Sequence, residues 1–314
     1  MSHLRKDPLV KRWVVVATKR RHRPRKVEEC PFCPGNEGLT PPEVLRIPEK
    51  KDWQVRVVPN LFPILGDHGE TTRSPFYRSR PGKGFHEIII ETPLHNRHIA
   101  ELELNNLKLV LDTYQHRLRE FNDLSWIRYT LIFKNYGRRA GASLKHSHSQ
   151  VVAMPLLPKR VAEELTSAKA YYRRHRRCLF CQIIAEEKET EDRIIVSNRH
   201  YLAFVPYAAR IPYEIWIMPI RHQAYFDRVS DDEKFAFAEI IQSCLKRLVK
   251  VLDDPPFNFF LHTGPNHLDA GDYYHYHLVI MPVTTILGGF ELGSGFYVNQ
   301  SLAEEDAQRL REAG

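Results

Sequence analysis

Apolar residues recur at helical spacing in two stretches of the chain, each after a strand-like segment that ends at a histidine. The two strand-like segments are residues 85–95 and 212–222. Ser230 and Glu233 form a capping-box pattern, which predicts the start of the second helix. The apolar positions that define the two helices are Leu104, Leu107, Leu111, Tyr114, Leu118 and Phe121, and then Phe235, Ala238, Ile241, Leu245 and Leu248.

Paired strands follow each helix, so the order of elements is repeated. Residues 129–134 lead to a strand at His146, and residues 257–262 lead to a strand at His275. This duplication predicts an α+β fold of two tandem units, each an antiparallel sheet with a packed helix, that meet as a pseudo-dimer. The predicted units are 1–160 and 161–314, with a charged connecting helix near residues 159–177.

Composition is typical of a soluble globular protein, since 43% of the 314 residues are hydrophobic and 27% are charged. No apolar run approaches the roughly 20 residues that a membrane helix needs. The first seven residues lack the apolar stretch of a signal peptide. We therefore expect a cytoplasmic location and no membrane partner.

A formal net charge of +8 favours anionic partners, either nucleic acid or phosphorylated small molecules. The densest basic cluster is residues 19–26, which include Arg20 and Arg23. Taken alone, such a run is more often a solvated loop than a binding site.

Four of the five cysteines form two Cys-x-x-Cys pairs, and each pair precedes histidine-bearing strands. Without a secretory signal a disulfide framework is not expected, and redox chemistry would hardly explain two such pairs. Tetrahedral zinc suits sets of two thiolates and two imidazoles, and four protein ligands make a site structural. The predicted sets are Cys30, Cys33, His95 and His146, and Cys178, Cys181, His222 and His275; iron is an alternative at the second site.

His146, His148 and Gln150 alternate along a strand, so their side chains share one face. If His146 binds metal, His148 is the free imidazole and a competent nucleophile toward phosphorus. Gln150 could donate its amide to a phosphoryl oxygen. The preceding loop, with Gly141 and Ser143, could supply backbone N–H groups and a hydroxyl to the same charge.

The second unit repeats the His-x-His pattern but not the rest of the motif. Val279 stands where the counterpart of Gln150 should be, and residues 266–270 lack the Gly-Ala-Ser element. The second unit is therefore predicted to lack the chemistry, and His277 to be a structural or binding histidine.

Several separated motifs resemble the galactose-1-phosphate uridylyltransferase branch of the histidine-triad superfamily over nearly the whole length of the chain. The matching segments are residues 5–9, 13–17, 23–24, 30–33, 58–63 and 141–143, the His-x-His-x-Gln motif, and 289–291.

This resemblance implies a double displacement through a covalent nucleotidyl-His148, with the His146 carbonyl orienting the ring. It also implies a homodimer, because in this family the partner subunit completes the sugar-phosphate part of the site. The binding residues implied are Gln150, Ser143, Asn135, Arg20, Arg23 and Gly141 at the phosphates, Asn60 and Leu61 at base and ribose, and Phe290 and Glu291 at the hexose.

Ser147 departs from the family pattern, since typical uridylyltransferases carry proline between the two histidines. His-Ser-His-Ser-Gln and the segment 289–293 resemble the plant-type relatives that act as ADP-glucose phosphorylases, which also carry a second Cys2His2 set. The leading prediction is nucleotidyl exchange of the UDP-glucose and galactose 1-phosphate type. The alternative is phosphorolysis of ADP-glucose with inorganic phosphate as acceptor.

A basic zinc protein that binds RNA is the competing class of function. The two cysteine pairs are about 145 residues apart, whereas a zinc ribbon has roughly 15–20 residues between them. No RNA-recognition motif with interleaved aromatic residues is evident. A nucleic-acid partner is therefore not expected.

Overall fold

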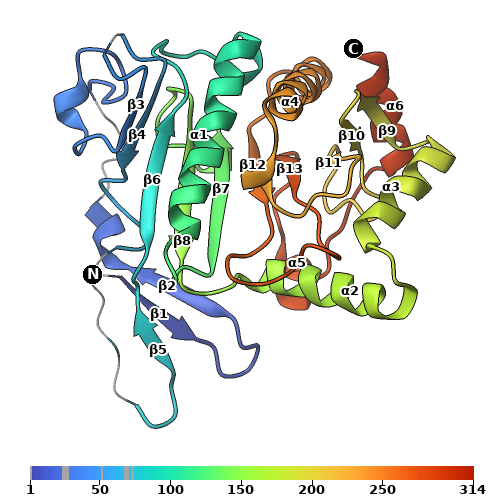
Figure 1. Cartoon of the computed structure of the whole chain (residues 1–314), viewed down its shortest axis with the longest axis horizontal. Helices are drawn as coiled ribbons and strands as arrows, with labels where there is room; N and C mark the ends of the chain where they lie inside the picture. Colours follow the sequence, from blue (N-terminus) through green and yellow to red (C-terminus); the bar gives the residue numbers. More distant parts are fainter. Residues whose placement is uncertain (1, 23–27, 51, 67–70, 72–73) are drawn as a thin grey trace.

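The computed structural model describes residues 2–22, 28–50, 52–66, 71 and 74–314, so the predicted binding residue Arg23 lies outside the described residues. Within these described residues, the main sheet has ten antiparallel strands in the order β3-β4-β6-β8-β7-β12-β13-β11-β10-β9 (Figure 1). Their bounds are β3 Leu45–Ile47, β4 Val55–Pro59, β6 Phe85–Ile90, β7 Tyr129–Tyr136, β8 His148–Met154, β9 Ile194–Ser197, β10 Tyr201–Phe204, β11 Ile215–Pro219, β12 Phe257–His262 and β13 His277–Pro282.

Two long helices pack together and cover the sheet over both halves of the chain (Figure 1). The helix predicted from Leu104 onward is α1, Leu104–Asn122, and the one predicted from the capping box is α4, Asp231–Leu252. The predicted connecting helix is α2, Lys159–His175. The other helices are α3 Leu179–Thr190, α5 Gly289–Ser294 and α6 Ala303–Glu312, with 3-10 turns at Thr18–His22, Glu37–Leu39, Ile99–Glu101, Arg138–Ala140 and Phe226–Arg228.

The two α+β units predicted from the repeat are confirmed, but their sheets are joined into one. β7 of the first half pairs antiparallel with β12 of the second, with Phe260 opposite Phe133. Each half contributes five strands to the main sheet. Joining the two sheets pairs the strand edges that two separate sheets would leave open. One apolar core, which includes Leu111, Ile132 and Leu245, therefore runs under both halves.

Strands β8 and β13 begin at the second histidine of each His-x-His pattern, two residues later than the sequence pattern indicates. His146 and His275 lie just ahead of these strands and are fully buried. Their rings face the cysteine pairs, as described below. The two halves are thus alike at the very position where the chemistry was predicted.

A second, small sheet was not predicted from the sequence. It has the order β2-β1-β5, with β1 Ser2–Lys6, β2 Trp13–Ala17 and β5 Ser79–Pro81. Leu4 of β1 packs against Leu65 and against Val152 of β8, which anchors this sheet on the main one. Among the described residues, no helix is long and apolar enough to cross a membrane.

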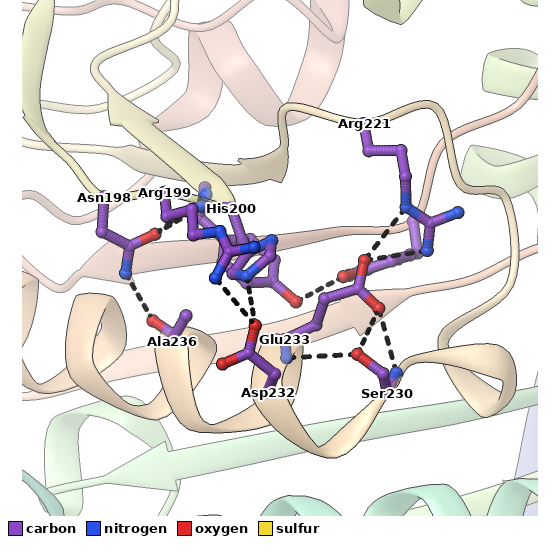
Figure 2. A network of polar contacts seen from close by, with 10 residues as sticks. Asn198, Arg199, His200, Arg221, Ser230, Asp232, Glu233 and Ala236 are labelled. Atoms are coloured by element: carbon purple, nitrogen blue, oxygen red, sulfur yellow. Dashed lines mark hydrogen bonds and ion pairs between the residues drawn. The ribbon is translucent and has the colours of Figure 1, made fainter.

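The capping box predicted at the start of α4 is present and extends into a larger polar network (Figure 2). The Glu233 backbone N–H donates to Ser230 Oγ at 3.3 Å, and the Ser230 N–H donates to Glu233 Oε2 at 3.0 Å. The other carboxylate oxygen accepts from the Arg221 guanidinium at 2.8 Å. The cap therefore fixes the segment that carries the next residue, His222, which is a predicted metal ligand.

Candidate active site and metal centres

The first predicted Cys2His2 set converges on one point. The ligand atoms of Cys30, Cys33, His95 and His146 all lie within 4.8 Å of one another. Cys33 Sγ is 3.3 Å from His95 Nδ1 and 3.6 Å from His146 Nδ1. Tetrahedral zinc, with bonds of about 2.3 Å to sulfur and 2.0 Å to nitrogen, would separate such atoms by about 3.5 Å. This donor set therefore fits a four-coordinate metal ion.

The hydrogen bonds of His146 leave its Nδ1 available as a ligand. Its Nε2 lies 2.7 Å from the carbonyl oxygen of Thr92, so the Nε2–H donates and the lone pair is on Nδ1. Metal-binding histidines usually donate their other ring nitrogen in this way. Burial lowers the pKa of His146, which favours the neutral imidazole that a metal needs.

The second predicted set, Cys178, Cys181, His222 and His275, is assembled in the same manner. Cys178 Sγ is 3.6 Å from His275 Nδ1, and Cys181 Sγ is 3.3 Å from His222 Nδ1. The Nε2–H of His275 donates to the carbonyl of Arg221 at 3.2 Å, and that of His222 donates to Gly271. In both rings the lone pair is therefore on Nδ1, the atom that faces the cysteine sulfurs.

A third group of side chains that could hold a metal ion adjoins the second set and was not predicted from the sequence. Glu164 of α2, His262 of β12 and His277 of β13 have ligand atoms within 4.8 Å of one another. Glu164 Oε2 accepts from His262 Nδ1 at 3.0 Å and from Tyr274 at 2.8 Å. Burial alone would raise the pKa of Glu164, but the hydrogen bond and charge of His262 lower it to about 2. Sequence reasoning took α2 for a connecting helix, so Glu164 carried no signal of its own.

His148 is buried at the start of β8, with its ring held by the residue two positions earlier. Its Nδ1–H donates to the His146 carbonyl oxygen at 2.7 Å, so Nε2 carries the lone pair. The ring also lies 5.3 Å from that of Phe32, between the two cysteines of the first pair. Burial, followed by the positive charge of Lys134, lowers the pKa of His148 to about 4. His148 is therefore neutral, with a lone pair on Nε2 at neutral pH.

A cavity of about 530 Å³ contains four of the predicted residues: Asn135, Ser143, His146 and His148. It is also lined by cationic side chains, including Arg138 and Lys145, which suit a phosphorylated ligand. Gly141 lies in the turn beside it with a φ of +92°, a left-handed conformation that favours glycine. Asn135 is itself held by Asn258, whose amide donates to Asn135 Oδ1 at 2.8 Å.

His86 of β6, which sequence reasoning missed, fixes the orientation of Gln150. The backbone N–H of Ile64 donates to His86 Nδ1 at 3.0 Å, so the proton of this ring is on Nε2. That Nε2–H donates to Gln150 Oε1 at 3.0 Å. The Gln150 carbonyl oxygen therefore accepts from His86, and the Gln150 amide nitrogen points away from the His86 ring. The same Nε2 lies 3.1 Å from the amide nitrogen of Asn60.

The remaining predicted residues do not line the cavity that contains His148. Arg20 donates to the Phe62 carbonyl at 2.8 Å, which places it beside the predicted base-binding residues Asn60 and Leu61. Leu61 is 62% exposed. Phe290 and Glu291 belong to the exposed helix α5 in the second half, where Glu291 caps the N-terminus of its own helix.

We expect His86→Phe to lower kcat about 10-fold, because the Gln150 amide would no longer be held in one orientation. KM should change less than kcat, since His86 does not line the cavity and, of the residues predicted to contact base and ribose, lies beside Asn60. Steady-state kinetics of the purified variant check this. His116→Phe, on the exposed face of α1, is the control and should be unaffected. A loss of affinity without a loss of kcat would contradict the assigned role.

Fold and site together define a duplicated α+β protein. Its first half carries the full His-x-His-x-Gln motif, whereas its second half has Val279 in place of the glutamine. The chain belongs to the galactose-1-phosphate uridyl transferase family: the N-terminal domain of that family matches residues 1–158, and the C-terminal domain matches residues 164–313. The resemblance predicted from the motifs is thus confirmed.

Relatives of both predicted kinds are similar to this chain. An ADP-glucose phosphorylase of Arabidopsis thaliana is 34% identical, with 98% of this chain and 92% of the relative covered. A galactose-1-phosphate uridylyltransferase of Thermotoga maritima is 29% identical over 99% of this chain and 98% of its own. A solved structure of a uridylyltransferase mutant has a TM-score of 0.89 at 30% identity, covering 100% of this chain and 97% of the other.

Proposed function

We propose that the chain transfers a nucleoside monophosphate between a nucleotide sugar and a hexose 1-phosphate, through a covalent intermediate on His148. The observation that carries this proposal is the hydrogen bond from His148 Nδ1 to the His146 carbonyl, which leaves Nε2 as the nucleophilic atom at a cationic cavity.

In the first step, Nε2 of His148 attacks the α-phosphorus of the nucleotide sugar. An N–P bond forms, the P–O bond to the sugar phosphate breaks, and hexose 1-phosphate leaves. In the second step, a phosphate oxygen of the acceptor attacks the same phosphorus and the N–P bond breaks. The Gln150 amide and the Ser143 hydroxyl would donate to the phosphoryl oxygens, and Asn135 and the Gly141 turn would hold the adjacent phosphate.

The second candidate function is ADP-glucose phosphorolysis, in which inorganic phosphate is the acceptor. Two observations favour it: Ser147 between the two histidines, and the similarity to an ADP-glucose phosphorylase. Separate assays with UDP-glucose and ADP-glucose, each with galactose 1-phosphate or inorganic phosphate, decide between the two. Preferred use of ADP-glucose and phosphate would select the phosphorylase.

The donor sets support zinc as a structural ion in both Cys2His2 centres, with iron the alternative in the second. Such an ion would pin a cysteine pair to the loop ahead of a histidine strand. We assign the catalytic unit to residues 1–160. The C-terminal unit, residues 161–314, would carry the second metal site and the sugar-phosphate-contacting segment at residues 289–291. Phe290 is 61% exposed and does not line the His148 cavity, which supports a homodimer in which it and Glu291 serve the partner's site. We further expect the enzyme to act in the cytoplasm, without nucleic-acid partners.

The rate of nucleotidyl-enzyme formation should stay constant from about pH 8 to pH 5.5 and fall only as the pH approaches 4. Protonation removes the lone pair of Nε2, and burial lowers the pKa of His148 from 6.5 to about 4. Quenched labelling at a series of pH values measures this profile. A decline centred at the ordinary histidine pKa would contradict it.

A further inference from the structure

Two charged side chains are buried side by side next to the strand that carries His148. Lys134 of β7 has a 1% exposed side chain, and Glu91, the residue after β6, has none of its side chain exposed. Lys134 Nζ lies 2.6 Å from Glu91 Oε2. Neither group belongs to a metal centre, and the proposed reaction assigns neither a chemical step.

Every donor of the Lys134 ammonium group has an acceptor. Besides Glu91, Lys134 Nζ donates to Ser147 Oγ at 2.9 Å and to the backbone carbonyl of His148 at 3.1 Å. The Glu91 carboxylate in turn accepts from Ser147 Oγ at 2.6 Å and from Ser149. Tyr114 of α1 donates to the same carboxylate at 3.3 Å. Burial alone would raise the pKa of Glu91, but Lys134 and the serine hydroxyls hold it below its usual range.

These contacts fix Ser147 and Ser149, the residues on either side of His148, and also the backbone carbonyl of His148. Side chains alternate along a strand, so Ser147 and Ser149 project to the face opposite the His148 imidazole. The backbone N–H of Glu91 also donates to the carbonyl of Ser147 at 3.2 Å. The ion pair therefore joins the ends of three neighbouring strands, β6, β7 and β8, directly behind the imidazole.

Apolar residues of similar volume often stabilise a core as well as a buried ion pair does. Stability alone therefore does not account for this pair. We propose that Lys134 and Glu91 are positioning residues, which fix the His146–Ser149 backbone so that Nε2 of His148 lies in line with the α-phosphorus. They act through the hydrogen bond from His148 Nδ1 to the His146 carbonyl. The proposal rests on the proposed function of His148.

The test is the paired variant Lys134→Met/Glu91→Gln, which removes both charges and leaves neither unpaired. We expect the rate of nucleotidyl-enzyme formation from labelled nucleotide sugar to fall about 10- to 100-fold, because a small displacement of a reacting atom costs this much. KM should stay within about twofold of wild type: Lys134 lines the cavity, but its ammonium group donates to three protein acceptors rather than to the open space. Metal content should not change.

The buried pair Arg117 and Glu87 provides a matched control. Their side chains are 4% and 7% exposed, and Arg117 Nε donates to Glu87 Oε2 at 2.7 Å. Glu87 lies on β6 opposite Val151 of β8, in the same strand pair but away from the nucleophile. Arg117→Met/Glu87→Gln should form the labelled enzyme at the wild-type rate for each folded molecule. The same rate in Lys134→Met/Glu91→Gln would overturn the proposal.

If the paired variant does not fold, Ser147→Ala tests the same network with a smaller change. It removes one hydrogen bond from each buried charge, so the labelling rate should fall several-fold with KM unchanged. Ser147→Thr keeps the hydroxyl and should restore the rate, whereas equal rates for alanine, threonine and wild type would overturn the proposal. Absence of label on the wild-type enzyme would instead contradict the proposed function itself.

Discussion

The His148→Ala variant should lose nucleotidyl transfer by about 10⁴- to 10⁶-fold, the usual cost of removing an enzyme's nucleophile. Nε2 of this ring is the atom that would form the bond to phosphorus, and no other group along β8 offers a comparable lone pair. The change should leave both cysteine-histidine sets intact, because His148 is not among their ligands. Initial rates and metal analysis of the same preparation measure both effects.

The pseudo-symmetric histidine provides a control for this experiment. His277 begins β13 as His148 begins β8, and its Nδ1–H donates to the His275 carbonyl at 3.1 Å. It lies beside Glu164 rather than at the cationic cavity. For each folded molecule, His277→Ala should therefore retain transfer. A His148→Ala variant that keeps its activity would remove His148 from the mechanism.

The second large effect is expected from Cys30→Ser. A zinc ion held by Cys30, Cys33, His95 and His146 would join a cysteine pair to the loop ahead of β8, so binding and folding are coupled. Loss of one thiolate should remove one metal ion per chain. It should also lower the free energy of unfolding by several kcal/mol, since structural zinc contributes roughly 10–16 kcal/mol of folding free energy in zinc-finger peptides. Elemental analysis and thermal unfolding check the two effects together.

Cys244 of α4 is the matched control, since its thiol is buried in the core and belongs to neither cysteine-histidine set. Burial raises the pKa of this thiol to about 12, so it stays protonated. Cys244→Ala should keep full metal content and cost only the lost packing. If Cys30→Ser also keeps its metal, the first centre is wrongly assigned.

The convergence of each cysteine pair with its two histidines could be predicted from the sequence, because the same order of cysteines and histidines occurs twice. One coincidence of spacing is weak evidence, but a repeated one specifies which histidine belongs to which pair. The packed helices could be predicted for a related reason, since α1 and α4 show helical periodicity over many residues. The capping box at Ser230 then fixed the start of α4.

The side chains that contact β8, the strand that begins at His148, could not be predicted. They come from neighbouring strands whose register the sequence does not reveal. His86 reaches Gln150 diagonally across β6 and β8, where Gln150 is opposite Ile88. Lys134 and Glu91 meet only because β6 and β7 both flank β8. The junction of the two sheets at β7 and β12 likewise depends on backbone pairing, which leaves no mark on composition or periodicity.

The central claim is a nucleotide covalently bound to His148, and mapping the labelled residue tests it most directly. The wild-type enzyme is incubated with nucleotide sugar labelled in the α-phosphate, quenched in base and digested, and the labelled peptide is sequenced. Label that is stable in base, released by acid and attached to the peptide containing His148 is the expected result. Label on any other residue, or an enzyme that turns over without becoming labelled, would contradict the account.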